Sequence, residues 1–316
     1  YKVTGCTVII NMKYDVPYKI NSTVPFWDFI VRNSVDADQT LTITDFIENP
    51  GDEPDDSNDD LVDLTAQPLV ILNDLTIEEN CTLDANGADV KIGDDFTLKD
   101  GGTYIHGNNT TSFIENKHST ITVENSTNPG ELQFYNVTID KDQRYDISLF
   151  WDVEVNSPGR NSSDHPVEIL GDLYIGRGEF DVDEWEVDVK GNIEIVDGQI
   201  ISSETTKAKG WIVLNGSNRQ TIKGALSAEQ EFGTFELYNR KGAELLSDIN
   251  VSSIILTPEP DTSIFNLDVY NLDIADSIYT SGTYSFSRHP GFLWFTLFQI
   301  CLIVLFHRTE VYLFSC

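Results

Sequence analysis

One long segment of the chain occurs twice with the same alternation of apolar and polar residues. The first copy, ILNDLTIEENCTLDANGADVKIGDDFTLKDGG, begins at Ile71, and the second, ILGDLYIGRGEFDVDEWEVDVKGNIEIVDGQ, begins at Ile169. The copies align at an offset of 98 residues that becomes 97 after one deletion, so that Leu83 matches Phe180. Self-similarity at a fixed period is typical of stacked repeat architectures. The sequence therefore predicts an array of units of about 100 residues, each built like its neighbour.

A second landmark marks the borders of these units. It reads Phe26-Trp27-Asp28, Phe134-Tyr135-Asn136 and Leu237-Tyr238-Asn239. A partial third copy of the longer segment begins at Ser263. We therefore predict a β-helix repeat region over residues 1–286, with a partial unit at 1–25 and units that begin at about 26, 134 and 235.

Short runs of alternating residues fill the repeat region. DLTI, DVKI, DFTL, DLYI, EVDV, IEIV and GWIVL are rich in β-branched and aromatic residues, which is typical of short strands. Dipeptides that tolerate a positive φ, Asn86-Gly87, Asp100-Gly101, Asp197-Gly198 and Asn215-Gly216, predict turns between them. Within the second copy, Val187 and Val189 alternate with Asp188. We expect the valines to point inward and Asp188 to point outward.

Two all-β architectures fit strands at this spacing. One is a right-handed parallel β-helix, or β-solenoid, and the alternative is a series of tandem β-sandwich modules. The apolar pattern continues through 134–139 and 235–246, and no Pro/Gly-rich linker separates one unit from the next. Sandwich modules usually show such a linker. The sequence therefore favours the β-solenoid.

The chain is strongly acidic. Its 316 residues include 52 Asp and Glu against 20 Lys and Arg, which gives a formal net charge of −32. Such a charge repels phosphate backbones, so we expect no nucleic-acid partner. The acids either keep long sheet surfaces from associating or bind cations.

The acids are densest in one loop, at 48–63. This loop holds eight acidic residues and two prolines, and Asp56, Asn58 and Asp60 have the spacing that can place alternate oxygens around Ca²⁺. A solvated loop without a metal is the alternative, because Leu61 and Gln67 stand where an EF-type loop has Gly and Glu. Ca²⁺ is the one cofactor that the sequence suggests.

Nine N-x-[ST] sequons indicate candidate glycosylation sites on an exported protein, although a strand composition rich in Asn and Thr explains them equally well. They start at Asn21, Asn80, Asn108, Asn109, Asn125, Asn136, Asn161, Asn215 and Asn250. The four cysteines, Cys6, Cys81, Cys301 and Cys316, form no metal-binding or disulfide pattern.

The composition changes at residue 287. The segment 287–316 carries a single acid, Glu310, and a 15-residue apolar stretch from Phe292 to Phe306, whereas a spanning helix needs about 20 residues. We interpret this tail as a membrane anchor or as a fusion that does not belong to the repeat protein.

No catalytic constellation stands out. The five histidines occur outside known motifs, and acid pairs such as Asp94-Asp95 are frequent enough to arise by chance. A polysaccharide lyase on a β-helix would place a basic residue beside acids, and Arg177 and Lys190 are the candidates for that role. The sequence therefore predicts a protein without enzymatic activity.

The repeat pattern GDLxI…FDxxxxxVxVxGdxxI…xxYN, over residues 69–286, resembles that of secreted bacterial and archaeal surface proteins built as right-handed β-helices, both adhesin-like and surface-layer-like. The resemblance implies an extracellular structural or adhesive protein at the cell surface, with cell-envelope, extracellular or polysaccharide partners and membrane contact through the tail. The alternative is a carbohydrate-active β-helix enzyme, a polysaccharide lyase or glycoside hydrolase. Exposed Trp185 and Trp211 would favour the enzyme, and buried ones the structural role.

Overall fold

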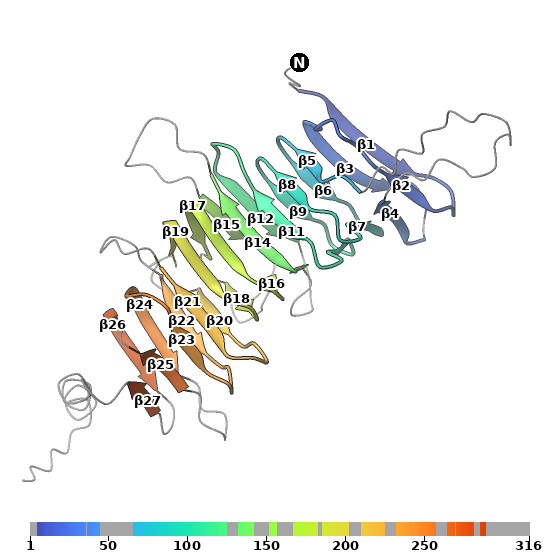
Figure 1. Ribbon diagram of the computed structural model, residues 1–316. Helices are drawn as coiled ribbons and strands as arrows, with labels where there is room; N and C mark the ends of the chain where they lie inside the picture. Colours follow the sequence, from blue (N-terminus) through green and yellow to red (C-terminus); the bar gives the residue numbers. More distant parts are fainter. Residues whose placement is uncertain are drawn as a thin grey trace, which may run out of the picture.

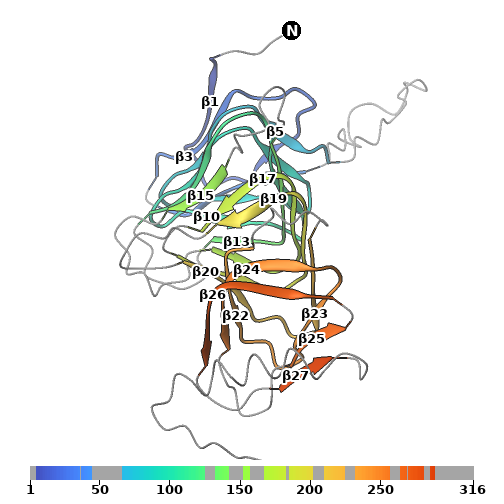
Figure 2. The same ribbon diagram turned by 90° about the vertical axis from the view of Figure 1, so that its left-hand side faces the viewer.

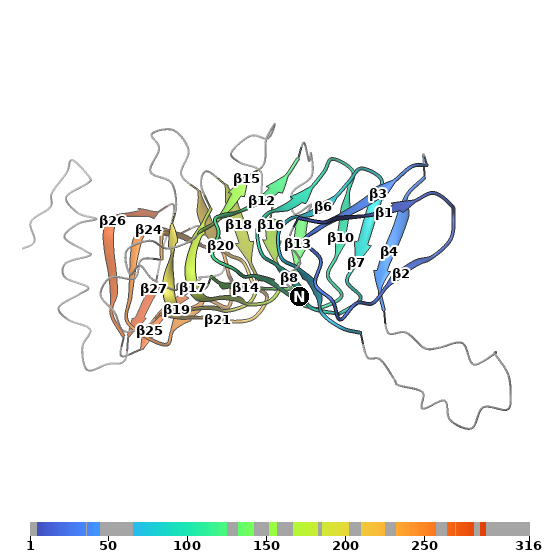
Figure 3. The ribbon, with the colours of Figure 1, turned by 90° about the horizontal axis from the view of Figure 1, so that it is seen from above.

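The computed structural model is an elongated all-β protein (Figure 1). It describes residues 5–35, 37–44, 66–124, 132–141, 152–156, 167–182, 185–201, 210–224, 232–256, 264–268, 270–280 and 285–288. Across these ranges the chain forms strands and no helix. The strands follow one another along a single axis in the order of the sequence (Figures 1 and 3).

The described strands belong to three sheets. The largest has 16 strands: β1 (Thr7–Met12), β3 (Asp28–Asn33), β5 (Leu69–Ile71), β6 (Leu75–Ile77), β8 (Val90–Ile92), β9 (Phe96–Leu98), β11 (Thr110–Phe113), β12 (Ser119–Val123), β14 (Asn136–Asp140), β15 (Asp152–Asn156), β17 (Leu173–Asp181), β19 (Ile193–Ile201), β21 (Gln220–Lys223), β23 (Ala243–Leu245), β25 (Ile264–Asp268) and β27 (Ser285–Arg288).

The two smaller sheets lie on another side of the coils, one after the other along the axis. The 4-stranded sheet comprises β2 (Tyr18–Ile20), β4 (Gln39–Ile43), β7 (Cys81–Asp84) and β10 (Thr103–Ile105). The 7-stranded sheet comprises β13 (Leu132–Phe134), β16 (Val167–Ile169), β18 (Glu186–Val189), β20 (Trp211–Leu214), β22 (Thr234–Leu237), β24 (Ile249–Leu256) and β26 (Leu272–Thr280).

Neighbouring strands in these sheets pair in parallel and come from successive coils of the chain. Leu75 of β6 pairs with Phe96 of β9, which pairs with Ile121 of β12, so each coil places an apolar residue directly over the previous one. The coils overlie one another around a common interior (Figure 2). This arrangement confirms the predicted β-solenoid. The sandwich alternative is wrong, because sandwich modules are built from antiparallel strands.

The predicted repeat of about 100 residues is not the structural repeat, which is the single coil. Leu83 and Phe180, aligned in the sequence, are both fully buried as expected, but Leu83 lies in the 4-stranded sheet and Phe180 in the 16-stranded sheet. Val90 and Val187 likewise lie in different sheets. The two copies therefore share the alternation of strands rather than equivalent positions in the coil.

The second landmark marks equivalent positions in two of its three copies. Phe134 and Leu237 lie on one inward-facing ladder of the 7-stranded sheet, linked through Ile169, Val189 and Leu214. Phe26 forms a bridge to Ile71 of the 16-stranded sheet instead. Phe134 and Leu237 thus occupy matching places in their coils, and Phe26 does not.

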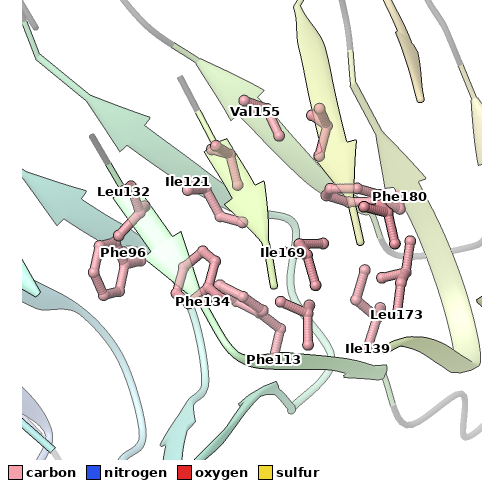
Figure 4. Close-up of a cluster of buried hydrophobic side chains, with 14 of the residues drawn as sticks. Phe96, Phe113, Ile121, Leu132, Phe134, Ile139, Val155, Ile169, Leu173 and Phe180 are labelled. Carbon is pink, nitrogen blue, oxygen red and sulfur yellow. The ribbon is translucent and has the colours of Figure 1, made fainter. Parts of the chain in front are cut away.

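The interior is filled with side chains along the stack. Buried apolar residues form one cluster from Met12 to Ile254. Its centre is aromatic, since the ring of Phe134 lies 5.5 Å from that of Phe96 (Figure 4) and 5.8 Å from that of Tyr104. A fully buried apolar side chain contributes about 1.5 to 3 kcal/mol, so this continuous core is the main source of stability.

Glycine allows neighbouring coils to come into close contact within the long strands. Asp197-Gly198, expected in a turn, lies within β19, and Gly198 pairs with Gly178 of β17. A Cβ atom on Gly198 would lie 2.0 Å from the Gly178 carbonyl oxygen. The Asn86-Gly87 turn is as predicted, with φ of 50° and 82°.

The predicted loop at 48–63 lies outside the described residues, and so does the tail except for Ser287 and Arg288, which belong to β27. Strand β27 therefore crosses the expected border at 286. Within the described residues, no helix has the length and hydrophobicity needed to span a membrane.

Candidate functional site

Charged side chains gather at one corner of the solenoid, where three neighbouring strands of the large sheet begin. Asn73-Asp74 precedes β6, Asp94-Asp95 precedes β9, and Lys117 lies two residues before β12. Because β6, β9 and β12 are parallel neighbours, the residues before them are brought to the same edge. We call Asn73, Asp74, Asp94, Asp95 and Lys117 the acidic corner.

The three carboxylates of the acidic corner are close together. One oxygen from each of Asp74, Asp94 and Asp95 lies within 4.8 Å of the others, and all three side chains are half-buried. Gly93 permits this approach, because a Cβ atom there would lie 2.2 Å from the Leu72 carbonyl oxygen. Three carboxylate oxygens at such a spacing are suitable ligands for a hard divalent cation.

Lys117 supplies the positive charge of the corner. Its Nζ lies 2.9 Å from Asp94 Oδ2, donates a hydrogen bond to Asn73 Oδ1, and lies 5.2 Å from the centroid of the Trp27 ring. Asn73 Nδ2 in turn donates to Asp28 Oδ1 at 2.8 Å. The contacts therefore connect four successive coils and keep the lysine between an aromatic ring and a carboxylate.

Two of the carboxylates also cap the backbone of the next coil. Asp74 Oδ1 accepts the N–H of Asp95 at 3.3 Å, and Asp95 Oδ1 accepts the N–H of Thr120 at 2.8 Å. Further along the stack, backbone N–H groups donate in the same way to an Asp or Asn side-chain oxygen on the preceding coil: Thr110 to Asp89, Asp172 to Asn136, Asn192 to Asp172, Thr221 to Asn192 and Asn271 to Asp248. These bonds satisfy backbone donors where the strands begin, so the acidic corner has a structural role of its own.

Burial and mutual repulsion alter the acidity of the corner. Desolvation raises the pKa of Asp74 above its ordinary value, and the charges of Asp95, Asp94 and Asp28 raise it further. Desolvation also raises the pKa of Asp95, as does Asp94, against the opposing effects of the Thr120 N–H, Lys141 and Lys117. The buried Lys141, which donates to Ser119 Oγ, therefore shares with Lys117 the task of offsetting the acids.

We expect Asp74→Asn to stabilise the protein at pH 7 by less than about 1 kcal/mol. The amide keeps the acceptor for the Asp95 N–H and removes one repelling charge. A carboxyl whose folded pKa is raised binds its proton more tightly in the folded state, so its destabilising effect grows as pH rises from the unfolded pKa near 4. Urea unfolding at pH 7 and pH 4 should therefore show the gain at pH 7 and its loss at pH 4.

Asp74→Ala is the matched control, because it removes the same charge together with the acceptor. We expect it to be about 1 kcal/mol less stable than Asp74→Asn at pH 7. Equal stability of the two variants would show that the bond to the Asp95 N–H contributes nothing.

The two basic residues singled out in the sequence lie elsewhere and both form ion pairs. Lys190 pairs with Glu168, whose carboxylate also accepts a 2.7 Å bond from Gln133 Nε2. The Glu168 side chain is 12% exposed. Arg177 Nε lies 3.9 Å from Asp197 Oδ2 on the neighbouring strand. Neither basic residue belongs to the acidic corner.

The two tryptophans differ in exposure. Trp185 is buried, which is the arrangement expected of a structural coil. Trp211 is half-buried and donates from Nε1 to Glu236 Oε2 at 2.9 Å, in the same sheet that carries Glu168. The test proposed from the sequence therefore gives a divided answer.

The described sequons differ in accessibility. Asn108 is exposed, whereas Asn109 is 2% exposed and its Nδ2 donates to Ala88 O and Tyr104 Oη. Half-buried side chains are those of Asn21, Asn80, Asn136, Asn215 and Asn250. Asn125 and Asn161 lie outside the described residues, as do Asp56, Asn58 and Asp60, so the Ca²⁺ loop stays a prediction.

Among the described cysteines and histidines, Cys81 and His106 have shifted pKa values. Cys81 is buried, and desolvation, followed by the charge of Glu78, raises the pKa of its thiol to about 12. A thiol of that pKa is not a nucleophile at neutral pH. His106 stacks on Tyr135 with ring centroids 5.8 Å apart, and burial lowers its pKa.

Sequence reasoning noted Asp94-Asp95 but missed the acidic corner as a unit. A signal was available, since Asn73-Asp74 and Asp94-Asp95 precede their strands at a spacing of one 21-residue coil. Lys117 could not be found in this way, because its coil is longer. Comparisons with protein-family models, with curated proteins and with solved structures found no match.

Proposed function

We propose that this protein is a non-enzymatic structural element of the cell surface, a rigid β-helical stalk with an acidic exterior. The observation that supports the proposal is the uninterrupted apolar core from Met12 to Ile254. Each coil rests on the previous one without a hinge between units, so the stack transmits force and sets a fixed distance. The partners would then be components of the cell envelope or the extracellular medium, such as polysaccharides, and the exposed Asn108 is the sequon best placed to carry a glycan.

The size of such a stalk follows from the topology. The longest path through the large sheet runs from β1 to β27 through 12 strands. Parallel strands lie about 4.8 Å apart, so 11 intervals span about 50 Å. We expect small-angle scattering of the intact chain to give a rod with at least this length. A compact particle would contradict the proposal.

The carbohydrate-active enzyme remains the second candidate, because Glu168 and the half-buried Trp211 lie in one sheet, and Lys190, directly after β18 of that sheet, pairs with Glu168. Incubation of the protein with a panel of polysaccharides distinguishes the structural stalk from the enzyme. The stalk should release no reducing ends and no unsaturated sugars, and surface labelling of intact cells of the source organism should reach it. Release of either product, reduced in Lys190→Ala and retained in the distant Lys91→Ala, would favour the enzyme.

A further inference from the structure

The sequence contains two Asn-Gly pairs, and the structure places them in different surroundings. Asn86-Gly87 joins β7 to β8, and Asn215-Gly216 directly follows β20. An Asn-Gly pair is chemically labile, because the backbone nitrogen of the glycine can attack the side-chain carbonyl carbon of the asparagine and no Cβ atom hinders the approach. In a folded protein the rate of this reaction depends on whether the glycine nitrogen is accessible and whether the turn can move.

The first pair forms an exposed turn. Asn86 and Gly87 are both exposed and have a positive φ, and the bond from Ala88 N to Ala85 O at 2.8 Å closes the turn. The Asn86 side chain donates from Nδ2 to Ile43 O at 3.2 Å, which is at the long end of the range for such a bond. Within the part of the chain that the structure describes, the N–H of Gly87 donates no hydrogen bond. The nitrogen that would attack is therefore free in an exposed turn.

The second pair is packed against the preceding coil. Gly216 is buried, and a Cβ atom on it would lie 2.2 Å from Lys190 O. Its N–H donates to Gln220 Oε1 at 2.9 Å. The side-chain oxygen of Asn215 is buried as well. The nitrogen that would attack is therefore enclosed and already engaged in a hydrogen bond.

The acceptor of that bond is itself held in place. Gln220 is 1% exposed, and its Nε2 donates to Val189 O at 2.8 Å and to Gly191 O at 2.6 Å. Its Oε1 also accepts a bond of 2.9 Å from Asn239 Nδ2. Opening of the second Asn-Gly pair thus requires the loss of buried hydrogen bonds, whereas the first pair can open by a local movement of an exposed turn.

We propose that Asn86 is a site of spontaneous deamidation in the folded protein, and that Gln220 protects Asn215 from the same reaction. The nitrogen of Gly87 forms a bond to Cγ of Asn86, and the side-chain nitrogen leaves as ammonia with the proton that the glycine nitrogen has lost. Solvent water then opens the succinimide ring at either of its carbonyl carbons, which gives aspartate or isoaspartate. The reaction needs no oxidant, and it adds one negative charge to the chain. It does not depend on the structural function proposed above.

The product should disturb the contact between two coils. The turn lies directly against the next coil, because a Cβ atom on Gly107 would lie 2.3 Å from Gly87 N. Isoaspartate lengthens the main chain of the turn, and either product replaces the donor to Ile43 O with a carboxylate. The new charge would also lie near Asp84, whose Oδ1 accepts the N–H of residue 86. We therefore expect the modified protein to melt at a lower temperature and to lose hydrogen-exchange protection in β7, β8 and β10.

Peptide mass spectrometry of the folded full chain, incubated at mildly alkaline pH, tests the proposal. Conversion at Asn86 should be about tenfold or more faster than at Asn215, because the second pair must first break buried hydrogen bonds. In concentrated urea the two rates should agree within about twofold, since the folded surroundings are then lost. Enzymatic methylation of isoaspartate should label the product at residue 86, which shows that the reaction passed through the succinimide ring.

Two variants provide the controls. Asn86→Gln should abolish conversion at residue 86 and leave the rate at Asn215 unchanged, because ring closure on the longer side chain is slow. Gln220→Ala should raise the rate at Asn215 by about tenfold and leave that at Asn86 unchanged, because it frees the N–H of Gly216. If this variant unfolds, both sites will react at their urea rates, and the unaltered chain then decides the proposal.

Equal rates at the two sites in the folded, unaltered chain would overturn the proposal. Absence of conversion at Asn86, or conversion to aspartate with no isoaspartate, would do the same. An unchanged rate at Asn215 in a folded Gln220→Ala variant would contradict the protecting role of Gln220.

Discussion

Val187→Asp should destabilise the protein by about 3 kcal/mol or more. Val187 is fully buried on β18, on an inward-facing ladder between Val167 of β16 and Ile212 of β20. An aspartate there would lie among apolar side chains, where it must either lose its hydration or bind a proton. Chemical denaturation followed by circular dichroism measures the loss, which should be smaller at pH 4 than at pH 7.

Asp188→Asn is the matched control, one residue along the same strand. Asp188 is half-buried on the outward face, in register with Glu168 and Val213. The amide keeps the shape of the side chain and removes a charge beside another acid, so stability should change by less than about 0.5 kcal/mol. A larger loss for Asp188→Asn than for Val187→Asp would contradict the register of the sheet.

Alternation made the inward and outward faces predictable from the sequence. A shift of one residue would turn the whole apolar set of a strand outward, so Val187, Val189 and Asp188 allow a single register. Strand existence was predictable for the same reason. The period was not, because copies at an offset of 97 or 98 residues match in alternation while Leu83 and Phe180 lie in different sheets.

The acidic corner was harder to predict because it depends on coil length. Asp74 and Asp95 precede strands one 21-residue coil apart, but the next coil is 25 residues long, and Lys117 follows a different spacing. Each extra residue in a coil increases the sequence separation between residues on neighbouring coils, while their positions in space stay the same. A charge on one coil and its partner on the next therefore have no fixed separation for a motif to record.

The acidic side chains on the exterior repel one another, and the few basic residues offset part of this repulsion. Lysines lie across from acids on neighbouring coils, Lys99 beside Glu124 and Lys223 beside Glu194. Exposed pairs of this kind contribute about 0 to 1 kcal/mol each. They reduce repulsion between coils more than they hold the coils together, which leaves cohesion to the apolar interior.

Truncation of an aromatic side chain at the centre of the apolar interior should give the second large loss of stability. Phe134→Ala should cost about 3 to 5 kcal/mol, the usual range for removing a buried phenylalanine ring. The ring of Phe134 is fully buried, and its centroid lies 5.5 Å from that of Phe96 and 6.4 Å from that of Phe113 (Figure 4). It lies 5.8 Å from the centroid of the Tyr104 ring. These rings belong to three different sheet faces of successive coils, so a cavity here cannot be closed by moving one strand.

Two control variants are compared with Phe134→Ala: Phe134→Leu and Leu246→Ala. Leucine refills part of the cavity, so its cost should be less than half that of alanine. Leu246 is 43% exposed, and its truncation should change stability by less than about 0.5 kcal/mol. Hydrogen exchange should show the loss in Phe134→Ala concentrated in β9, β11 and β13, because each coil of a solenoid contacts only its neighbours. Equal costs for Phe134→Ala and Leu246→Ala would mean that Phe134 is not part of a close-packed core, and the continuous interior on which the proposed stalk depends would be lost with it.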